Sequence, residues 1–367
     1  MGIDPVMERT DIVAKKIIGV AIAGQGRSGY DIHARWLREA PKQYKIVAVA
    51  DLMAVRRKQA VEAFGCKAYP NAEAMLAHDD VDLVVNALPN HLHPPFTLAA
   101  LRAGRHVVCE KPAATKVADM DRMIAAARKA KRVLAPFQNG RFGLVFRKIQ
   151  DVIASGVLGE ILHVRIARGG FGRRWDWQTR QDLKGGSLNN TGPHPLDQAV
   201  MLFGTKTPKV FAKLVSGPGS FGDADDFAAV TLYGSGSPTV EVLVTSYAAY
   251  GSGPAFLVNG TCGGLTVRDG SVLWRYFDPA KAPKHRLMTG WSQQRGYCRE
   301  KLPWIEKSWT PPKISDSFQS NSKAFYDNIH DVLTGKGTLV VTPAQVRRQV
   351  GVLEACHRQN RLKKRDA

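Results

Sequence analysis

The sequence predicts an α/β protein with two domains. The first is a doubly wound parallel sheet, and the second is an α+β domain with an open, mostly antiparallel sheet. The chain has 367 residues, which is too many for one ordinary domain. Its first third alternates short apolar runs with amphipathic segments. After about residue 140 the apolar runs follow one another closely, separated by glycine and aspartate turns.

The apolar runs of the first third are short enough to be buried strands, and the amphipathic segments are long enough to be crossover helices. We expect strands at 15–24, 44–51, 81–89, 105–112 and 133–137. We expect helices at 28–40, 54–65, 72–80, 94–104 and 119–132. This alternation requires parallel strands with helices on both faces of the sheet. It defines an N-terminal domain over 15–138.

The second domain is expected over 139–367. It opens with a helix at 143–156 and a strand at 161–170. Further strands are expected at 209–217, 227–234, 239–250, 255–269 and 271–278. The chain closes with helices expected at 321–335 and 342–360. We expect the helices to cover one face of the sheet, and the open face is a candidate oligomer interface.

Composition and charge exclude several classes of protein. The net charge of +20 is spread along the chain, and no zinc-finger spacing or aromatic RNA-binding signature accompanies it, so no nucleic-acid partner is expected. An anionic substrate or simple solubility explains the charge better. No apolar run approaches the roughly 20 residues that span a bilayer, and no signal peptide is visible, which predicts a cytoplasmic protein. Five scattered cysteines without a CxxC pair predict reduced thiols and no metal site.

The stretch AGQGRSG has the G-x-G-x-x-G spacing at Gly24, Gly26 and Gly29. It follows an expected strand and opens an expected helix, as a dinucleotide site requires. The first glycine permits a tight turn, the second lets a pyrophosphate approach the backbone, and the third packs the helix on the strand. Arg27 and Ser28 lie at the helix N-terminus, which faces the anion. The stretch therefore predicts a dinucleotide site.

Asp51 ends the second expected strand, about twenty residues after the glycines. A carboxylate there accepts hydrogen bonds from both adenosine ribose hydroxyls and repels a 2′-phosphate, so NAD is the expected cofactor. Arg56 and Arg57 follow closely and offer a pairing for a 2′-phosphate, which keeps NADP open. As solvated helix residues they would have no such role.

The catalytic candidates come from two motifs. Glu110 and Lys111, in CEKP, follow the fourth expected strand of the first domain, and ligands of doubly wound sheets bind at such strand ends. A lysine beside a cationic nicotinamide has a depressed pKa, which suits proton relay. A surface lysine before a proline turn is the alternative. The second motif, GGSLNNTGPHPLDQ, places Asn190 and His194 in a glycine-rich loop before a helix, where a capped turn is the alternative.

Taken together, GQGRSG, LPNHLHPPFTLAALRAGRHVVCEKP and GGSLNNTGPHPLDQ resemble the glucose–fructose oxidoreductase and inositol dehydrogenase family, written Gfo/Idh/MocA. The likeness extends over nearly the whole chain. It implies a Rossmann domain, a bound nicotinamide cofactor, a carbohydrate or cyclitol substrate, and a homodimer or homotetramer. The resemblance also implies that Lys111 and His194 touch the reacting carbinol. The remaining contacts it implies near the cofactor are Leu88, Pro89, Asn90, His93 and Glu110.

This resemblance gives the glycine-rich loop a purpose. We expect the loop to be flexible because it wraps the substrate, and His194 to be held on a helix because a base must reach the hydroxyl that it deprotonates. Many relatives carry aspartate where Asn190 stands. Residues i and i+4 share a helix face, so we expect Asn190 and His194 to point together, with the amide orienting substrate and the proton work left to Lys111 and His194. A plain helix N-cap is the alternative for Asn190.

Three more residues are expected to contact substrate. Arg141 opens the second domain beside the cleft and could hold a polar or anionic group. Trp177 and Gln178 precede the glycine-rich loop, and a tryptophan face stacks well on a sugar ring, although tryptophan is more often a core residue. His91 and His93 lack a third ligand, so no metal site is expected there.

The leading functional prediction is an NAD-dependent dehydrogenase that transfers a hydride from a sugar, glycoside or cyclitol carbinol to nicotinamide. The alternative is a redox-neutral, NAD-dependent glycosidase, which oxidises a ring carbon, eliminates the aglycone, adds water and returns the hydride. An anionic glycoside is one candidate substrate for this route. No tyrosine clearly supplies the extra base that this second route needs. A third interpretation is a nicotinamide-binding protein with an inactive site, which the intact EKP and G-x-H motifs argue against.

Overall fold

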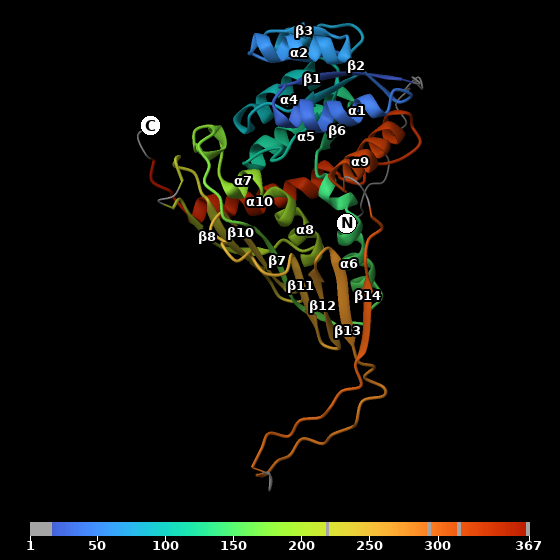
Figure 1. Cartoon of the computed structure of the whole chain (residues 1–367), viewed down its shortest axis with the longest axis vertical. Coiled ribbons are helices and arrows are strands. Elements are labelled where there is room, and N and C mark those ends of the chain that lie inside the picture. Colours follow the sequence, from blue (N-terminus) through green and yellow to red (C-terminus); the bar gives the residue numbers. More distant parts are fainter. Residues whose placement is uncertain (1–16, 218–219, 292–294, 314–316, 365–367) are drawn as a thin grey trace.

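The computed structural model describes residues 17–217, 220–291, 295–313 and 317–364. Lys15 and Lys16 of the first expected strand, and 365–367 at the end of the expected second domain, lie outside the described residues. Two lobes are stacked along the long axis of the molecule, and a narrow arm projects from the end of the second lobe (Figure 1). No helix in the described parts of the chain is both long and apolar enough to cross a membrane.

The first lobe contains a parallel six-stranded sheet in the order β3-β2-β1-β4-β5-β6, which confirms the predicted architecture. The strands are β1 (Ile18–Ala23), β2 (Tyr44–Ala50), β3 (Lys67–Tyr69), β4 (Leu83–Asn86), β5 (His106–Cys109) and β6 (Leu134–Pro136). The strand order reverses between β1 and β4, so a crevice opens at their carboxyl ends. The edge strand β3 was not predicted, because three residues, one exposed and two half-buried, are too few to show a periodic pattern.

The helices of this lobe follow the strands as crossovers. They are η1 (Arg27–Ala34), α1 (Arg35–Glu39), α2 (Ala54–Phe64), α3 (Ala72–Met75), η2 (Asn90–Leu92), α4 (His93–Arg102) and α5 (Val117–Ala130). The first expected helix is thus a π-helical stretch that continues as α1. α2 ends at Gly65, whose φ of +62° is the left-handed conformation that favours glycine at a helix C-terminus.

The second lobe contains an eight-stranded sheet in the order β14-β13-β12-β11-β7-β10-β9-β8. The strands are β7 (Ile161–Gly169), β8 (Lys209–Val215), β9 (Phe227–Tyr233), β10 (Thr239–Thr245), β11 (Phe256–Gly260), β12 (Gly263–Arg268), β13 (Ser271–Tyr276) and β14 (Ile305–Trp309). Among these strands β7 and β10 pair in parallel, and the other neighbours are antiparallel. The predicted mostly antiparallel sheet is confirmed.

One expected strand, 255–269, is in fact the hairpin of β11 and β12. Its turn at Thr261 and Cys262 is flanked by Asn259-Gly260 and Gly263-Gly264, a local turn signal that the expected continuous strand passed over. The turn is held by another segment, because the amides of Thr261 and Cys262 donate to the carbonyls of Glu160 and Leu158. Local turn residues and tertiary contacts therefore act together at this turn.

Helices cover one face of the second sheet (Figure 1). They are α6 (Leu144–Ala154), α8 (Pro193–Phe203) and α10 (Pro343–Gln359). The short helices η3 (Asn139–Phe142), η4 (Trp177–Thr179) and α7 (Ser187–Asn190) stand at the junction between the lobes. α9 (Ser317–Leu333) returns to the first lobe.

The two hydrophobic cores are joined by the C-terminal helices. Phe325 and Tyr326 of α9 and Val346 of α10 belong to the core of the first lobe, whereas Leu353 of α10 belongs to the core of the second. A division of the chain at residue 138 therefore does not describe these helices. The junction between the lobes is a packed interface, which can hold side chains from distant segments in fixed positions.

Candidate active site

The glycine-rich loop after β1 has the backbone geometry of a dinucleotide cradle. Gly24 has a φ of +89°, and a Cβ there would lie 2.5 Å from the Ala87 carbonyl oxygen. A Cβ on Gly29 would lie 1.8 Å from the carbonyl oxygen of Gly24. At Gly26, by contrast, a Cβ would meet a single atom within 4 Å, Nη1 of Arg56. The outer two glycines are required for packing, and the middle one leaves the approach to the backbone open.

Asp51 lies directly after β2, beside this loop. Its Oδ2 accepts a 2.8 Å hydrogen bond from the Gln25 amide, and its Oδ1 accepts one of 2.8 Å from the Met53 amide. Arg56 lies 3.6 Å from Oδ2, and Arg57 donates to the Asp51 carbonyl at 2.8 Å. Neither arginine is the purely solvated side chain that sequence offered as an alternative. Of the other two loop residues, Arg27 is exposed and Ser28 is half-buried.

The segment after β4 folds against the same crevice. Leu88 and Pro89 are half-buried, and Asn90 is buried. His93 is 1% exposed, and its two ring nitrogens contact the carbonyls of Pro112 at 2.7 Å and Leu88 at 2.8 Å. His93 thus ties the ends of β4 and β5 together through the backbone, which differs from the expected side chain facing the cofactor.

Lys111 and Glu110 lie just beyond β5. The Lys111 ammonium donates a 2.8 Å hydrogen bond to the carbonyl of Asn190, across the junction between the lobes. Burial lowers the pKa of Lys111, Glu110 raises it, and the nearby Arg27 and Arg174 lower it further. We conclude that the net effect is a depressed pKa, as expected for proton relay.

Glu110 is committed to the protein rather than open to a ligand. Its Oε2 accepts the Lys111 amide at 2.9 Å, and its Oε1 lies 3.2 Å from Nε2 of His33. His33 Nδ1 lies 2.6 Å from the Tyr326 hydroxyl in α9. Burial by itself raises the pKa of Glu110, but the hydrogen bond with His33 and the charge of Lys111 outweigh it and bring the pKa to about 2. Sequence analysis missed His33 and Tyr326, which are 293 residues apart.

Asn190 and His194 do not share one helix, which corrects the expected i, i+4 arrangement. α7 ends at Asn190, and α8 begins at Pro193 after a break at Thr191 and Gly192. Glycine is required at this break, since a Cβ on Gly192 would lie 2.3 Å from the Leu188 carbonyl oxygen. Asn190 is also not a helix N-cap, because it is the last residue of α7.

The Asn190 amide links three segments. Its Nδ2 donates to the Gln178 carbonyl at 3.0 Å, and its Oδ1 accepts from Asn90 at 3.1 Å. Its backbone carbonyl accepts from Lys111. Asn190 therefore holds Gln178, Asn90 and Lys111 in place through hydrogen bonds within the protein.

His194 lies in the first turn of α8 and is half-buried. Burial, and then the positive charge of Lys111, lower the pKa of His194 to about 4. The imidazole is consequently neutral near pH 7, and a neutral imidazole can accept a proton. The charge of Lys111 acts on His194, so the two side chains lie in the same neighbourhood.

Arg141 does not stand free beside the cleft. It is 5% exposed, and its Nε and Nη2 donate to the two carboxylate oxygens of Asp197, each at 2.6 Å. Nη1 donates to Gln345 of α10. All three guanidinium nitrogens thus bind within the protein, and the buried ion pair joins η3, α8 and α10. The expected contact between Arg141 and substrate is not supported.

The glycines that precede α7 are packed rather than mobile. A Cβ on Gly185 would lie 2.4 Å from the Gln178 carbonyl oxygen, and the Gly186 amide donates to that carbonyl at 2.7 Å. Gly186 has a φ of +107°, and a Cβ there would lie 2.1 Å from Asp225 Oδ1. Close backbone approach explains these glycines, and it corrects the expectation of a flexible loop.

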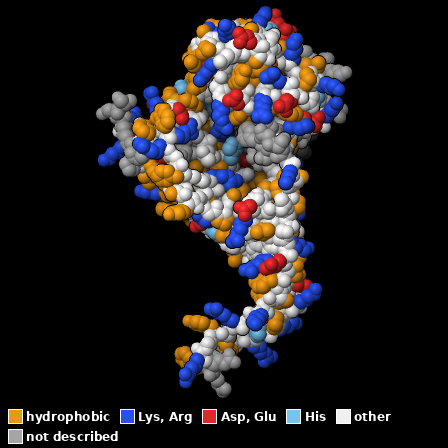
Figure 2. All heavy atoms as spheres, in the orientation of Figure 1, with side chains coloured by type: hydrophobic (Ala, Val, Ile, Leu, Met, Phe, Trp, Pro, Cys, Tyr) orange, Lys and Arg blue, Asp and Glu red, His pale blue; other side chains and the backbone are white. Residues whose placement is uncertain are grey.

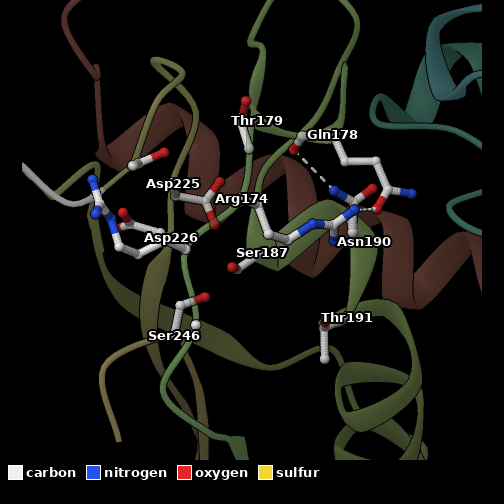
Figure 3. Close-up of a pocket in the computed structure, with 12 residues that line it drawn as sticks. Arg174, Gln178, Thr179, Ser187, Asn190, Thr191, Asp225, Asp226 and Ser246 are labelled. Carbon is white, nitrogen blue, oxygen red and sulfur yellow. Dashed lines mark hydrogen bonds between the residues drawn. The ribbon is translucent and has the colours of Figure 1, made fainter. Parts of the chain in front are cut away.

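A polar pocket of about 110 Å³ lies beneath the segment 172–179, beside Asn190. Its walls include Arg174, Gln178 and Asn190 on one side and Asp225, Asp226 and Ser246 on the other (Figure 3). Five hydroxyl side chains also line it: Thr179, Ser187, Thr191, Ser220 and Ser246. Alternating donors and acceptors of this kind suit a polyhydroxylated ligand.

Trp177 and Gln178, the two expected substrate contacts in this segment, differ in their positions. Gln178 lines the pocket, and its Oε1 accepts from Arg174. Trp177 is half-buried and is not among the pocket residues. Trp175, two residues earlier, is 78% exposed and packs edge-on against Phe221.

Positive charge gathers around the cleft. Arg27 and Arg174 both act on the pKa of Lys111, and Arg168 acts with Lys111 on the pKa of His194. Figure 2 shows further lysine and arginine side chains scattered over both lobes and the arm on the visible face. The structure thus brings Lys111, Asn190, Asn90, Gln178 and His194 together at the junction, while Arg141 and His93 are turned into the protein interior.

Comparison with known proteins adds to this geometry. Residues 18–137 match the model of an oxidoreductase family with an NAD-binding Rossmann fold, and 146–266 match a GFO/IDH/MocA C-terminal domain. A myo-inositol 2-dehydrogenase of Thermotoga maritima is 27% identical over 307 residues, which cover 81% of this chain and 90% of the relative. A D-glucoside 3-dehydrogenase of Escherichia coli is 35% identical over 192 residues, covering 50% and 54%.

Among solved structures, an NAD-binding protein from Listeria innocua superimposes with a TM-score of 0.76 at 26% identity. The match covers 95% of this chain and 97% of that protein. Within the described part of the present chain, no cluster of three histidine, cysteine or acidic side chains could hold a metal ion. All five cysteines are free thiols.

Proposed function

Because the chain belongs to the Gfo/Idh/MocA family of NAD-binding oxidoreductases, we propose that it interconverts a secondary carbinol of a sugar, glycoside or cyclitol and the corresponding ketone, with Lys111 and His194 as its catalytic residues. The observation that carries the proposal is the pairing of a buried lysine with a neutral histidine at the carboxyl end of β5. Lys111 reaches across the junction to Asn190, and His194 has a pKa of about 4.

The residues present fit a nicotinamide dinucleotide. The open side of Gly26 and the start of η1 would hold the pyrophosphate, and Asp51 would accept the adenosine ribose hydroxyls. Asp51 Oδ1 and Oδ2 each accept one backbone amide, which leaves further lone pairs on both oxygens. When bound, the nicotinamide supplies hydride exchange with the reacting carbon.

The chain's own residues then manage the proton. His194 is neutral above about pH 4, so it can accept the hydroxyl proton directly. Lys111 carries the positive charge that stabilises a developing alkoxide, and its depressed pKa makes proton exchange with His194 easier. Asn190 holds the Lys111 ammonium in place through its carbonyl.

The substrate class is supported by the polar pocket and by the relatives. Paired carboxylates, an arginine and several hydroxyls beside Asn190 suit a polyhydroxylated ring. The two relatives named above act, by their names, on an inositol and on a glucoside. A glycoside substrate would also allow the redox-neutral glycosidase route, because oxidation at C3 acidifies the neighbouring C–H.

A panel of neutral and anionic nitrophenyl glycosides, with the matching free sugars, separates these routes. Reduced nicotinamide and released nitrophenol are followed together in the presence of NAD. Accumulation of reduced cofactor without phenol supports the dehydrogenase. Catalytic phenol release without net reduction, lost when NAD is stripped, supports the glycosidase. Absence of both signals on every compound, with NAD still bound, contradicts the proposed activity.

The catalytic assignment is tested by Lys111→Ala and His194→Ala. Each should lower turnover by about 10²–10⁴-fold because a positioned proton-transfer group is lost. Binding of NAD, measured by calorimetry, should change little. Trp175→Ala is a matched control for a general disturbance of the cleft, since that side chain is 78% exposed and lies in the neighbouring loop. Near-normal rates in both alanine variants would contradict the assignment of Lys111 and His194 as catalytic residues.

A further inference from the structure

Three buried polar atoms near His194 have no hydrogen-bond partner among the described residues: Nδ1 of His194, Oε1 of Gln138 and Oε1 of Gln198. Gln138 and Gln198 are 2% and 6% exposed. A buried polar group without a partner costs about 1–3 kcal/mol, so three such groups in one neighbourhood require an explanation.

His194 and Gln198 meet around Gly140, and Gln138 is joined to this neighbourhood through Pro193. A Cβ built on Gly140 would lie 3.6 Å from His194 Nδ1 and 3.7 Å from Gln198 Nε2. The Gln198 amide donates to the Gly140 carbonyl, and the Gln138 amide donates to the carbonyl of Pro193, the neighbour of His194, each at 3.4 Å. These bonds fix the amide orientations, because the nitrogen of each amide must face the carbonyl. The two oxygens therefore remain as acceptors.

The numbers of donors and acceptors define what can satisfy this set. A water molecule has two hydrogens to donate and accepts through its lone pairs. Two amide oxygens use both hydrogens, so the third group must be a donor, and Nδ1 of His194 donates only when it carries the proton. We propose that Gln138 and Gln198, through one buried water beside Gly140, hold His194 as the Nδ1–H tautomer, and that they are positioning residues for this base.

The consequence lies at the other ring nitrogen. With the proton held on Nδ1, Nε2 keeps its lone pair and can accept a proton from a substrate hydroxyl. The charged groups that act on His194 are Lys111 and Glu110 at the end of β5 and Arg168 of β7. The inference rests on the proposed role of His194 as the base, but the tautomer itself can be measured without any substrate.

The direct experiment is nitrogen NMR of the whole protein with ¹⁵N-labelled histidine, at pH 7 and without substrate. The His194 signals are identified by their loss in His194→Gln. We expect Nδ1 to be protonated and Nε2 to be unprotonated in the wild type. In Gln138→Met/Gln198→Met, both tautomers should be populated. A wild-type ring protonated on Nε2 overturns the proposal, and so does an Nδ1–H ring that stays unchanged in the double variant.

Gly140→Ala provides a second variant in case the methionine pair folds poorly. Its methyl would make ordinary contacts, yet it would stand 3.6 Å from Nδ1, where the water is proposed. The same mixture of tautomers is expected. The matched control is Gln349→Met, because Gln349 of α10 is also fully buried with both amide atoms unpartnered. The His194 signals should remain unchanged in this control, and a tautomer shift there would count against a specific role.

Kinetics distinguish positioning from a merely structural role. In Gln198→Met, kcat should fall roughly three- to tenfold with an unchanged KM, because part of the enzyme holds the wrong tautomer. In Gln198→Glu, a carboxylate close to Nδ1 should raise the pKa of His194, so the acidic limb of kcat/KM should move to higher pH. An acidic limb that does not move contradicts the proposed contact. Should no substrate be turned over at all, the proposed function fails while the NMR result still decides the tautomer.

Discussion

The nucleotide loop and the catalytic junction are built in different ways. The loop is a backbone construction, in which Gly24 and Gly29 are required because no Cβ fits between neighbouring carbonyls. The junction is a side-chain construction, in which Lys111 reaches Asn190 across 79 positions and Asn90 reaches it across 100. A short motif can specify the first kind of site, whereas the second depends on the packing of whole lobes.

This contrast also separates two kinds of charge. At the nucleotide loop, Asp51 is held by the backbone amides of Gln25 and Met53, and the side chain of the nearby Arg56 is 44% exposed. At the junction, Arg141 and Asp197 form an ion pair that is closed to solvent on both sides. Buried pairs of this kind lose much more than exposed ones when a single partner is removed.

The largest effect is expected from breaking the backbone construction. Gly29→Ala should lower the free energy of unfolding by about 5 kcal/mol or more, because a Cβ would stand 1.8 Å from the Gly24 carbonyl oxygen. Gly26→Ala is the matched control, since space is open there. It should weaken NAD binding in calorimetry while urea unfolding stays near that of the wild type. Equal stability of the two variants would contradict the distinct roles of these glycines.

A double-mutant cycle on the buried ion pair of Arg141 and Asp197 tests the side-chain construction of the junction. Arg141→Ala should cost about 3–5 kcal/mol in urea unfolding, since it leaves the Asp197 carboxylate buried without its partner. Arg141→Met/Asp197→Leu should recover most of that loss. The KM for substrate should change little in the folded double variant. A KM raised more than about tenfold, with stability intact, would restore Arg141 as a substrate ligand.

The smallest effect, counted per pH unit, is a dependence of stability on pH that comes from Asp225 beside the polar pocket. Burial raises the pKa of Asp225 to about 7, although the Leu188 amide, which donates to it at 2.7 Å, acts in the opposite direction. Unfolded aspartate titrates near pH 4, so between pH 4 and 7 only the folded protein holds this proton. Its contribution to the free energy of unfolding should therefore fall by about 1.4 kcal/mol per pH unit as the pH rises through this window.

Asp225→Asn should remove that slope, because the amide does not titrate. The measurement is urea unfolding at intervals from pH 4 to pH 8, with the variant subtracted from the wild type at each pH. Asp226→Asn is the neighbouring control, since the Asp226 carboxylate accepts from the Gly217 amide at 2.9 Å and the Tyr247 hydroxyl at 2.6 Å. If the difference in free energy of unfolding between the wild type and Asp225→Asn does not change with pH, the raised pKa of Asp225 is contradicted.

Sequence alone was sufficient for most of what local pattern controls, although the turn between β11 and β12 was passed over. The alternation of strands and helices predicted the parallel sheet, and the glycine spacing placed Gly24 at a positive φ and Gly29 in a close contact. Asp51 followed from its place at a strand end. Periodicity and glycine spacing act within about thirty residues, so they can be read without knowing how the lobes meet.

Tertiary structure alone decided the partners at the junction. His33 meets Tyr326 through α9, which returns to the first lobe. The break between α7 and α8 separated Asn190 from His194, and Asp197 claimed the guanidinium of Arg141. A buried polar group takes whichever partner the packing brings within about 3 Å, and that partner's distance along the chain leaves no trace in the local sequence.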